Sequence, residues 1–128
     1  MKQYNCSYLQ IKNNIENQFV NKKIPQINIG DNIKIKLKVR EGNKNRVQMS
    51  EGIVISKKNE KINSSITIRK IIQNIGVERV YLVYSPFITD ISIINSAKVR
   101  KSKLYYLRTK LGKAAKLKNK KVALQKNF

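Results

Sequence analysis

The clearest pattern of apolar and polar residues in the chain is a strict alternation over residues 33–40. Apolar side chains occupy every second position and basic side chains lie between them: Ile33, Ile35, Leu37 and Val39 against Lys34, Lys36, Lys38 and Arg40. A period of two residues is typical of a β-strand with one apolar face. The basic face has two interpretations, a contact surface or a solvated face that protects a sheet edge.

Four further stretches repeat this pattern less strictly. Their in-phase apolar residues are Val47, Met49, Ile53 and Ile55, then Ile66 and Ile68, then Val80, Leu82 and Tyr84, and finally Ile91 and Ile93. Gly52 predicts a bulge or sharp bend, and turns are predicted at residues 41–45, residues 57–61, Gly76 and Ser85-Pro86. Five or six short strands predict a mainly β protein with a small, highly curved antiparallel barrel over residues 26–100. A barrel of this size fills its interior with side chains.

Residues 1–25 are predicted to form an N-terminal amphipathic helix, which Pro25 prevents from continuing. Polar residues separate an apolar stripe with spacings of three and four, made of Tyr8, Ile11, Ile15 and Phe19. The stripe has two interpretations. Either the helix packs on its own barrel, or it docks on a neighbouring molecule.

From Ser102 onward the apolar period becomes helical, which predicts a basic C-terminal helix and tail over residues 101–128. At about 100° per residue, a narrow apolar seam forms from Leu104, Leu107, Leu111, Ala115 and Val122. Lysines occupy most of the remaining circumference. We expect packing on the barrel to stop near Ala115 and a tail to begin beyond Lys118.

The charge of the chain is strongly positive and unevenly distributed. Its 128 residues carry 28 Lys and Arg against 7 Asp and Glu, a net charge of +21. The last acidic residue is Asp90, and residues 91–128 carry +12 of this charge. Because such self-repulsion destabilises a compact state, we expect a polyanionic partner, with nucleic acid favoured over an anionic membrane surface. A membrane is disfavoured because the apolar seam is narrow and no apolar run approaches about 20 residues.

Enzymatic chemistry finds little support in the residue types present. The chain has no His, one Cys, and acidic residues that are scattered along its length. General acid–base catalysis needs convergent groups, and metal sites need clustered His, Cys or carboxylate ligands. We therefore expect no enzymatic activity, cofactor, metal ion or small-molecule substrate.

Basic residues in loops, strands and the C-terminal part are the candidate contacts to RNA phosphates, together with a tyrosine that can stack on bases. Of the adjacent Tyr105 and Tyr106, we expect Tyr105 to be exposed, because neighbours on a helix cannot share a face. The candidate RNA-binding residues are Lys44, Arg46, Arg69, Lys70, Arg79, Arg100, Lys101, Lys103, Tyr105, Arg108, Lys110, Lys113, Lys116 and Lys118.

The stretch Val99–Arg108 also carries a resemblance to a known family. It resembles the nineteenth protein of the large subunit of bacterial-type ribosomes, including those of chloroplasts and mitochondria. The similarity extends from about Ile29 to Lys118. Further matches follow in the same order at Glu51–Ile55, Ile68–Ile71, Gly76–Val80 and Ser85-Pro86.

This resemblance implies an SH3-like barrel and a structural constituent of the ribosome. It implies binding to large-subunit rRNA near the subunit interface and contact with small-subunit rRNA in an intersubunit bridge. It also implies a neighbouring protein, the large-subunit protein numbered fourteen. From the residues alone, the alternative function is that of a DNA-binding or transcription-associated small β-barrel.

Residue usage bears on the compartment in which the chain works. Lys outnumbers Arg by 22 to 6, and Ile (19) and Asn (15) are frequent, which is typical of A- and T-rich codons. Since Arg is usually the better phosphate ligand, the preference for Lys is interpreted as mutational. We therefore predict a ribosome in the plastid (chloroplast) stroma, with the cytoplasm of an AT-rich bacterium as the alternative.

Overall fold

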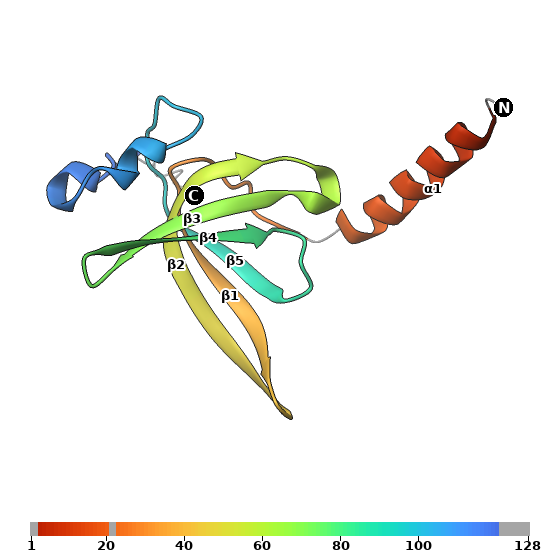
Figure 1. Ribbon diagram of the computed structural model, residues 1–128, viewed down its shortest axis with the longest axis horizontal. Coiled ribbons are helices and arrows are strands. Elements are labelled where there is room, and N and C mark those ends of the chain that lie inside the picture. Colours follow the sequence, from red (N-terminus) through yellow and green to blue (C-terminus); the bar gives the residue numbers. More distant parts are fainter. Residues whose placement is uncertain (1–2, 21–22, 121–128) are drawn as a thin grey trace, which may run out of the picture.

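The computed structural model describes residues 3–20 and 23–120 of the chain. This part is mainly β, with an N-terminal α-helix and a five-stranded antiparallel sheet (Figure 1). The elements are α1 (Gln3–Val20), β1 (Asn32–Glu41), β2 (Lys44–Lys58), the 3₁₀ helix η1 (Lys61–Asn63), β3 (Ser65–Ile72), β4 (Ile75–Leu82), β5 (Ile88–Asn95), and the 3₁₀ helices η2 (Tyr105–Arg108) and η3 (Gly112–Ala115).

The strands lie in the order β4-β3-β2-β1-β5 and form one curved sheet (Figure 1). β4 and β5 are its two edges, and within the described residues no ladder joins them, so the sheet is open. The predicted closure into a barrel is therefore not confirmed. After β4 the chain crosses to the other edge, where the Lys38 N–H donates to the Phe87 carbonyl (2.7 Å).

The alternation over residues 33–40 correctly predicted β1. Ile33 and Ile35 are fully buried, while Leu37 and Val39 on the same face are half-buried. A two-residue turn leads from β1 to β2, with Glu41 paired to Lys44 across it. The strongest sequence pattern thus corresponds to a strand that has a neighbour on both sides.

The turn between β3 and β4 lies at Gln73 and Asn74, and Gly76 belongs to β4. Gln73 and Asn74 both have positive φ angles, 49° and 63°. The prediction of a turn at Gly76 was therefore wrong by two residues. Asn tolerates the left-handed conformation because its short polar side chain can hydrogen-bond locally, so glycine is not required there.

β2 continues through Gly52, where the sequence predicted a bulge or bend, and the register of its pairing with β3 shifts nearby, between Val54 and Ser56. Its first part pairs with β1 and its last part with β3, so the strand is shared between two ladders. A Cβ atom at Gly52 would lie 2.5 Å from Ile68 Cγ2 and 2.7 Å from the Arg69 carbonyl oxygen. Only glycine permits this close approach of backbone. Val47 and Met49 are more than half exposed, because the predicted apolar face here lies on the part of β2 nearest the hairpin turn.

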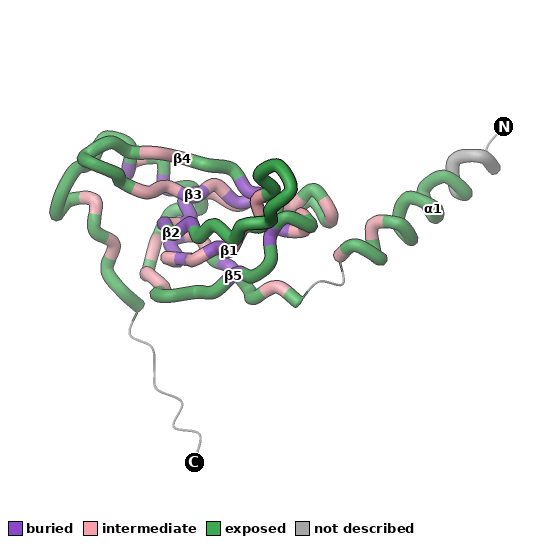
Figure 2. Tube along the Cα trace, turned by 90° about the horizontal axis from the view of Figure 1, so that it is seen from below, coloured by how far each residue is buried: buried purple, intermediate pink, exposed green. Residues whose placement is uncertain are grey.

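Buried residues lie on all five strands (Figure 2), and buried side chains form two apolar clusters. Because successive side chains on a strand point to opposite faces, Val54 enters the main core and Ile55 enters the second cluster. The main core contains Ile27, Ile33, Ile35, Val54, Ile66, Ile68, Tyr81, Val83, Ile88 and Ile91. The second cluster contains Ile55, Leu104 and Leu107, with Ile29, Val99, Tyr106 and Leu117 packed against them.

The inward face of β4 is the opposite of the predicted one. Tyr81 and Val83 are buried, whereas Val80 and Leu82 are 67% and 53% exposed. The Tyr81 hydroxyl donates a hydrogen bond to Ser50 Oγ (3.0 Å) inside the molecule. This polar contact lets a tyrosine occupy the core side, while Val80 and Leu82 remain on the outer face of an edge strand.

The predicted N-terminal helix is confirmed by α1, but its packing on the sheet is not. Its apolar stripe is 50–69% exposed, at Tyr8, Ile11, Ile15 and Phe19. The helix extends away from the sheet (Figure 1) and contacts η1, where Lys61 Nζ donates to Asn13 Oδ1 (2.9 Å). Docking of the stripe on a neighbouring molecule stays a prediction. None of the described helices is both long and apolar enough to cross a membrane.

The predicted C-terminal α-helix is not present in the described part of residues 101–128. Two short 3₁₀ helices replace it, because Leu111 is extended (φ −124°, ψ 154°) and Gly112 has φ +63°. The predicted seam is correct for Leu104 and Leu107, which are buried, and wrong for Leu111, which is 66% exposed. Val122 lies outside the described residues.

Candidate nucleic-acid interface

The C-terminal segment, residues 96–120, is attached to the sheet through its own backbone and two leucines. The Leu104 N–H donates to the Ile55 carbonyl of β2 (2.9 Å), and Leu104 and Leu107 are 0% and 3% exposed. Side chains three residues apart eclipse each other on a 3₁₀ helix, so both leucines point to the same side. The segment is therefore a folded part of the protein.

The two ends of this segment are held together. Ala97 and Asn119 form an isolated antiparallel bridge. The Lys98 N–H donates to the Lys118 carbonyl (3.0 Å), and the Lys120 N–H donates to the Ser96 carbonyl (2.7 Å). The chain between them is thus a closed loop, and basic residues from both of its ends come to lie side by side.

The adjacent tyrosines of η2 have different environments. Tyr106 packs on the second cluster, whereas Tyr105 is 41% exposed, as predicted. The Arg108 guanidinium lies 4.5 Å from the centre of the Tyr105 ring, and Lys103 Nζ lies 5.8 Å from it. Such cation–π contacts hold the charged groups near the ring faces. Tyr105 is therefore an exposed ring with two cations beside it.

Glu78 on β4 joins the sheet to η2. Its carboxylate accepts hydrogen bonds from Arg108 Nε and Nη2 (both 2.8 Å) and from Arg69 Nη1 (3.0 Å). These hydrogen bonds, from Arg108 above all, hold the pKa of Glu78 below its usual range. The same contact raises the pKa of Arg108. One carboxylate thus faces two guanidinium groups, so this cluster keeps a net positive charge.

A basic hollow of about 1180 Å³ opens in the surface of the C-terminal segment. Its rim and walls carry six cationic side chains and no acidic one. These cations face a common space and repel one another, so a bound polyanion would relieve their repulsion. The lining residues are Lys98, Val99, Arg100, Lys101, Tyr106, Lys110, Lys118, Asn119 and Lys120.

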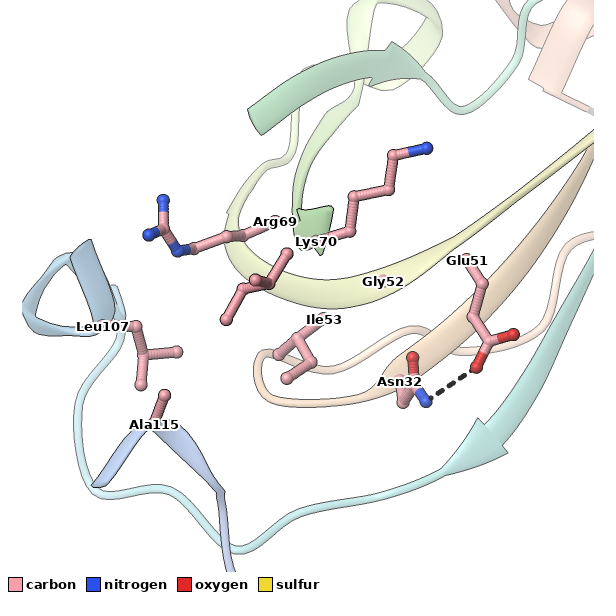
Figure 3. A pocket seen from close by; sticks show the side chains of 9 residues that line it. Asn32, Glu51, Gly52, Ile53, Arg69, Lys70, Leu107 and Ala115 are labelled. Atoms are coloured by element: carbon pink, nitrogen blue, oxygen red, sulfur yellow. Dashed lines mark hydrogen bonds between the residues drawn. The ribbon is translucent and has the colours of Figure 1, made fainter. Parts of the chain in front are cut away.

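A second, smaller hollow of about 360 Å³ lies between the sheet and the C-terminal segment. Figure 3 shows Leu107 and Ala115 facing Ile53 of β2 across it, with Arg69 beside them and Lys70 directed away. At its other end the Asn32 side-chain amide donates to Glu51 (3.2 Å). The apolar wall of this smaller hollow comes from the packing of the C-terminal segment against β2. The larger hollow differs from it in being lined mainly by cations.

The structure places the predicted site residues in distinct groups. Four of them line the basic hollow, namely Arg100, Lys101, Lys110 and Lys118. Tyr105 and Arg108 are the first and last residues of η2, and Lys103 precedes it. Lys113 in η3 and Lys116 just after it are exposed. Arg69, Lys70 and Arg79 lie on β3 and β4. Lys44 and Arg46 lie at the β1–β2 turn, far from the C-terminal segment (Figure 1).

Several predicted contacts have acidic partners within the protein. Arg69 is paired with Glu78 and its side chain is only 12% exposed, so it is mainly committed to the fold. Arg46 is paired with Glu41 (2.7 Å) at the β1–β2 turn. Sequence reasoning left Lys98 and Lys120 out of the candidate set. Both lysines lie in the basic run after Asp90, and this was the only sign in the sequence that they could belong to the site. They come together through the bridge between Ala97 and Asn119, which no local sequence pattern predicts.

Comparison with known proteins confirms the family that the motif Val99–Arg108 indicated. The family model described as ribosomal protein L19 matches residues 10–120. Large ribosomal subunit protein bL19c of Trieres chinensis is 54% identical over 105 residues, which cover 82% of this chain and 88% of that protein. The bL19c protein of Mesostigma viride is 52% identical over 111 residues, covering 87% and 93%.

The similarity extends to a cyanobacterial protein. Large ribosomal subunit protein bL19 of Synechocystis sp. is 48% identical over 108 residues, which cover 84% of this chain and 88% of that protein. The family match spans the sheet and the C-terminal segment with its basic hollow. The chain therefore belongs to the ribosomal protein L19 family, a family of structural proteins of the large subunit of bacterial-type ribosomes.

Proposed function

We propose that the chain binds large-subunit rRNA near the subunit interface and supports an intersubunit bridge. The observation that carries this proposal is the basic hollow, in which six cations from the two ends and the middle of the C-terminal segment converge without an acidic residue in the lining. Phosphates of two closely approaching RNA strands would supply the counter-charge. Seven of the ten remaining candidates extend the contact surface beyond the hollow, namely Lys44, Lys70, Arg79, Lys103, Tyr105, Lys113 and Lys116.

We propose a different role for each of the three parts of the chain. Residues 26–100 set the spacing between contact surfaces, residues 101–128 supply most of the phosphate contacts, and residues 1–25 face a neighbouring molecule. The proposed partners are large-subunit rRNA, small-subunit rRNA across the interface, and the large-subunit protein numbered fourteen. The relatives named bL19c support a ribosome of the plastid stroma as the location.

The binding test is a salt titration of the isolated protein on large-subunit rRNA. With about 6–10 phosphate contacts, the affinity should fall by three to five decades between about 50 and 200 mM salt. A flat titration contradicts the electrostatic mechanism. Competition with duplex DNA checks specificity, because a DNA-binding protein would prefer or equally accept the duplex.

The site test compares two triple variants with the same loss of charge. Replacing Lys98, Arg100 and Lys101 by Gln removes half of the cations of the basic hollow and should reduce incorporation into the large subunit, measured by gradient sedimentation. The control replaces Lys36, Lys58 and Lys61 by Gln, because these lysines lie outside the hollow and are paired with acidic groups. Equal incorporation of both variants would reject the hollow as the main contact. Deletion of residues 100–118 should abolish incorporation.

A further inference from the structure

The β1–β2 hairpin lies at the opposite end of the sheet from the C-terminal segment (Figure 1), and a third hollow opens beside it. It is a hollow of about 530 Å³ between the β1–β2 hairpin and the loop that precedes β5. Its lining combines an aromatic ring, two cations and two amide side chains. The lining residues are Lys38, Arg40, Asn43, Asn45, Pro86 and Phe87.

The strand register explains why these side chains meet. Leu37 pairs with Ile88, so the next residue outward on β1, Lys38, lies beside Phe87, and its N–H donates to the Phe87 carbonyl (2.7 Å). Arg40 lies on the same face of β1 as Lys38 and pairs with Asn45 of β2. The hollow is thus built by backbone ladders on both sides of β1.

The Phe87 ring is exposed while its backbone is fixed. The side chain is 64% exposed. The Phe87 N–H donates to Ser85 Oγ (3.3 Å), its carbonyl accepts from Lys38, and the next residue, Ile88, is anchored in the main core. The ring is therefore an open platform on a fixed stretch of backbone, so only its own side-chain torsions need ordering when a planar ligand stacks on it.

The two cations beside this platform are free to bind an anion. Lys36 on the same face of β1 is paired with Asp90 (3.4 Å), and Arg46 at the turn is paired with Glu41 (2.7 Å). Among the described residues, neither Lys38 nor Arg40 has an ion-pair partner, and both are exposed. The local charge is therefore positive next to an open aromatic ring.

We propose that this hollow binds an unpaired nucleotide of RNA. The base stacks on Phe87, the flanking phosphates contact Lys38 and Arg40, and the amides of Asn43 and Asn45 meet the base edge. An aromatic platform beside positive charge is the arrangement by which proteins bind single-stranded nucleic acid. The inference rests on the proposed rRNA-binding function and adds to it a second contact at the far end of the sheet, so one rigid body would hold two separate RNA elements.

The test uses the full chain and a fluorescein-labelled oligo(U) of about eight nucleotides, with binding followed by fluorescence anisotropy. Phe87→Leu should weaken binding by roughly five- to a hundredfold, because it removes the stacking surface. Phe87→Tyr should restore it. The matched control is Phe19→Leu, the same substitution at an exposed ring of α1, which should leave the affinity unchanged. Thermal unfolding verifies that Phe87→Leu remains folded.

A second readout separates stacking from charge. Lys38→Gln and Arg40→Gln should each lower the slope of log affinity against log salt by about 0.7, the value expected for one phosphate contact on a single strand. Phe87→Leu should lower the affinity and leave the slope unchanged. A loss of slope in Phe87→Leu would contradict the assignment of stacking to the ring.

The failure of this inference is distinguishable from failure of the proposed function. If the wild type binds and the Lys98, Arg100, Lys101 triple variant is weakened, but Phe87→Leu binds as wild type, the second site is overturned and rRNA binding stands. An equal loss in Phe87→Leu and Phe19→Leu overturns it as well. If the wild-type chain shows no salt-dependent binding to RNA, both proposals fall.

Discussion

Replacing Leu104 by alanine is expected to weaken the attachment of the C-terminal segment to the sheet. Leu104 is fully buried against Ile55 and Leu107, which are 0% and 3% exposed. Buried Leu→Ala substitutions cost about 2–5 kcal/mol, and the cost depends on how far the site can collapse. The second cluster has only three buried members and lies under a segment of short 3₁₀ helices, so it can relax. We therefore expect about 2–3 kcal/mol, in the lower half of that range.

The assay has a global and a local part. Urea unfolding gives the loss of stability, and hydrogen exchange shows where the loss is located. Because the main core does not include Leu104, protection of β1 and β3 should persist while the amide of Leu104, which donates to Ile55, exchanges faster. Local opening with free energy below that of global unfolding is the expected behaviour of such a segment.

The matched control is Leu111→Ala in the same segment. Leu111 is 66% exposed, so its truncation should change the free energy of unfolding by less than about 0.5 kcal/mol. The continuous helix predicted from the sequence would bury both leucines along one seam. If Leu111→Ala costs as much as Leu104→Ala, the arrangement of two 3₁₀ helices is refuted and the helical seam is restored.

Four further substitutions test the packing of the sheet and its contact with the C-terminal segment. Gly52→Ala should destabilise the protein by about 1–3 kcal/mol or more, because the added Cβ would meet a β3 carbonyl. Gly42→Ala should cost only about 1 kcal/mol, because Gly42 has a positive φ but open space around it. Urea unfolding measures both changes. Tyr81→Phe should cost about 1–3 kcal/mol by the same measurement, because Ser50 loses its buried partner. Glu78→Gln should lose about 1–2 kcal/mol at neutral pH, after allowance for the half-exposed Arg108. Folding lowers the pKa of Glu78, so the stability that its ionised carboxylate contributes is fully present above the unfolded pKa of about 4.3. This stability is lost as the pH falls through the folded-state pKa. The free energies of unfolding of wild type and Glu78→Gln should therefore converge at low pH. A constant gap between them at all pH values contradicts this.

Local patterns predicted those elements whose sequence permits one interpretation. The alternation in β1 allows a single phase, and Ile33 and Ile35 are buried as expected. The run from Val80 to Tyr84 is apolar at every position, so either set of alternate residues could face the core. The structure places Tyr81 and Val83 in the core, where the Tyr81 hydroxyl donates to Ser50 Oγ.

The C-terminal segment was mispredicted because its key spacing is ambiguous. Leucines three residues apart, such as Leu104 and Leu107, share a face in both an α-helix and a 3₁₀ helix. The two 3₁₀ helices are separated at Leu111, which is extended, and Gly112, which has a left-handed φ. Leu117 completes the apolar contact. The apolar periodicity predicts neither the break nor the contact of Leu117, since both depend on how the end of the segment folds back to residues 96–98.

The positive charge of the candidate site could be predicted from the sequence, but the shape of its surface could not. The run of Lys and Arg after Asp90 identifies the interacting part of the chain. The grouping of Lys98 with Lys120 requires the bridge between Ala97 and Asn119, which is a contact across the length of the segment. The Phe87 hollow likewise depends on the β1–β5 register, which places residues far apart in sequence beside each other.

The glycine in the middle of β2 has a consequence for how the chain avoids misfolding. Ile53, Val54 and Ile55 are three consecutive apolar residues, and the strand has an apolar cluster on each side. A slip of one position would still turn an apolar side chain from residues 53–55 toward each cluster, so these three residues alone cannot reject the slipped pairing. Gly52 rejects it, because a slip would bring a side chain under the Arg69 carbonyl where there is no room for a Cβ atom. The absence of a side chain at Gly52 thus selects the register in which β2 pairs with β3.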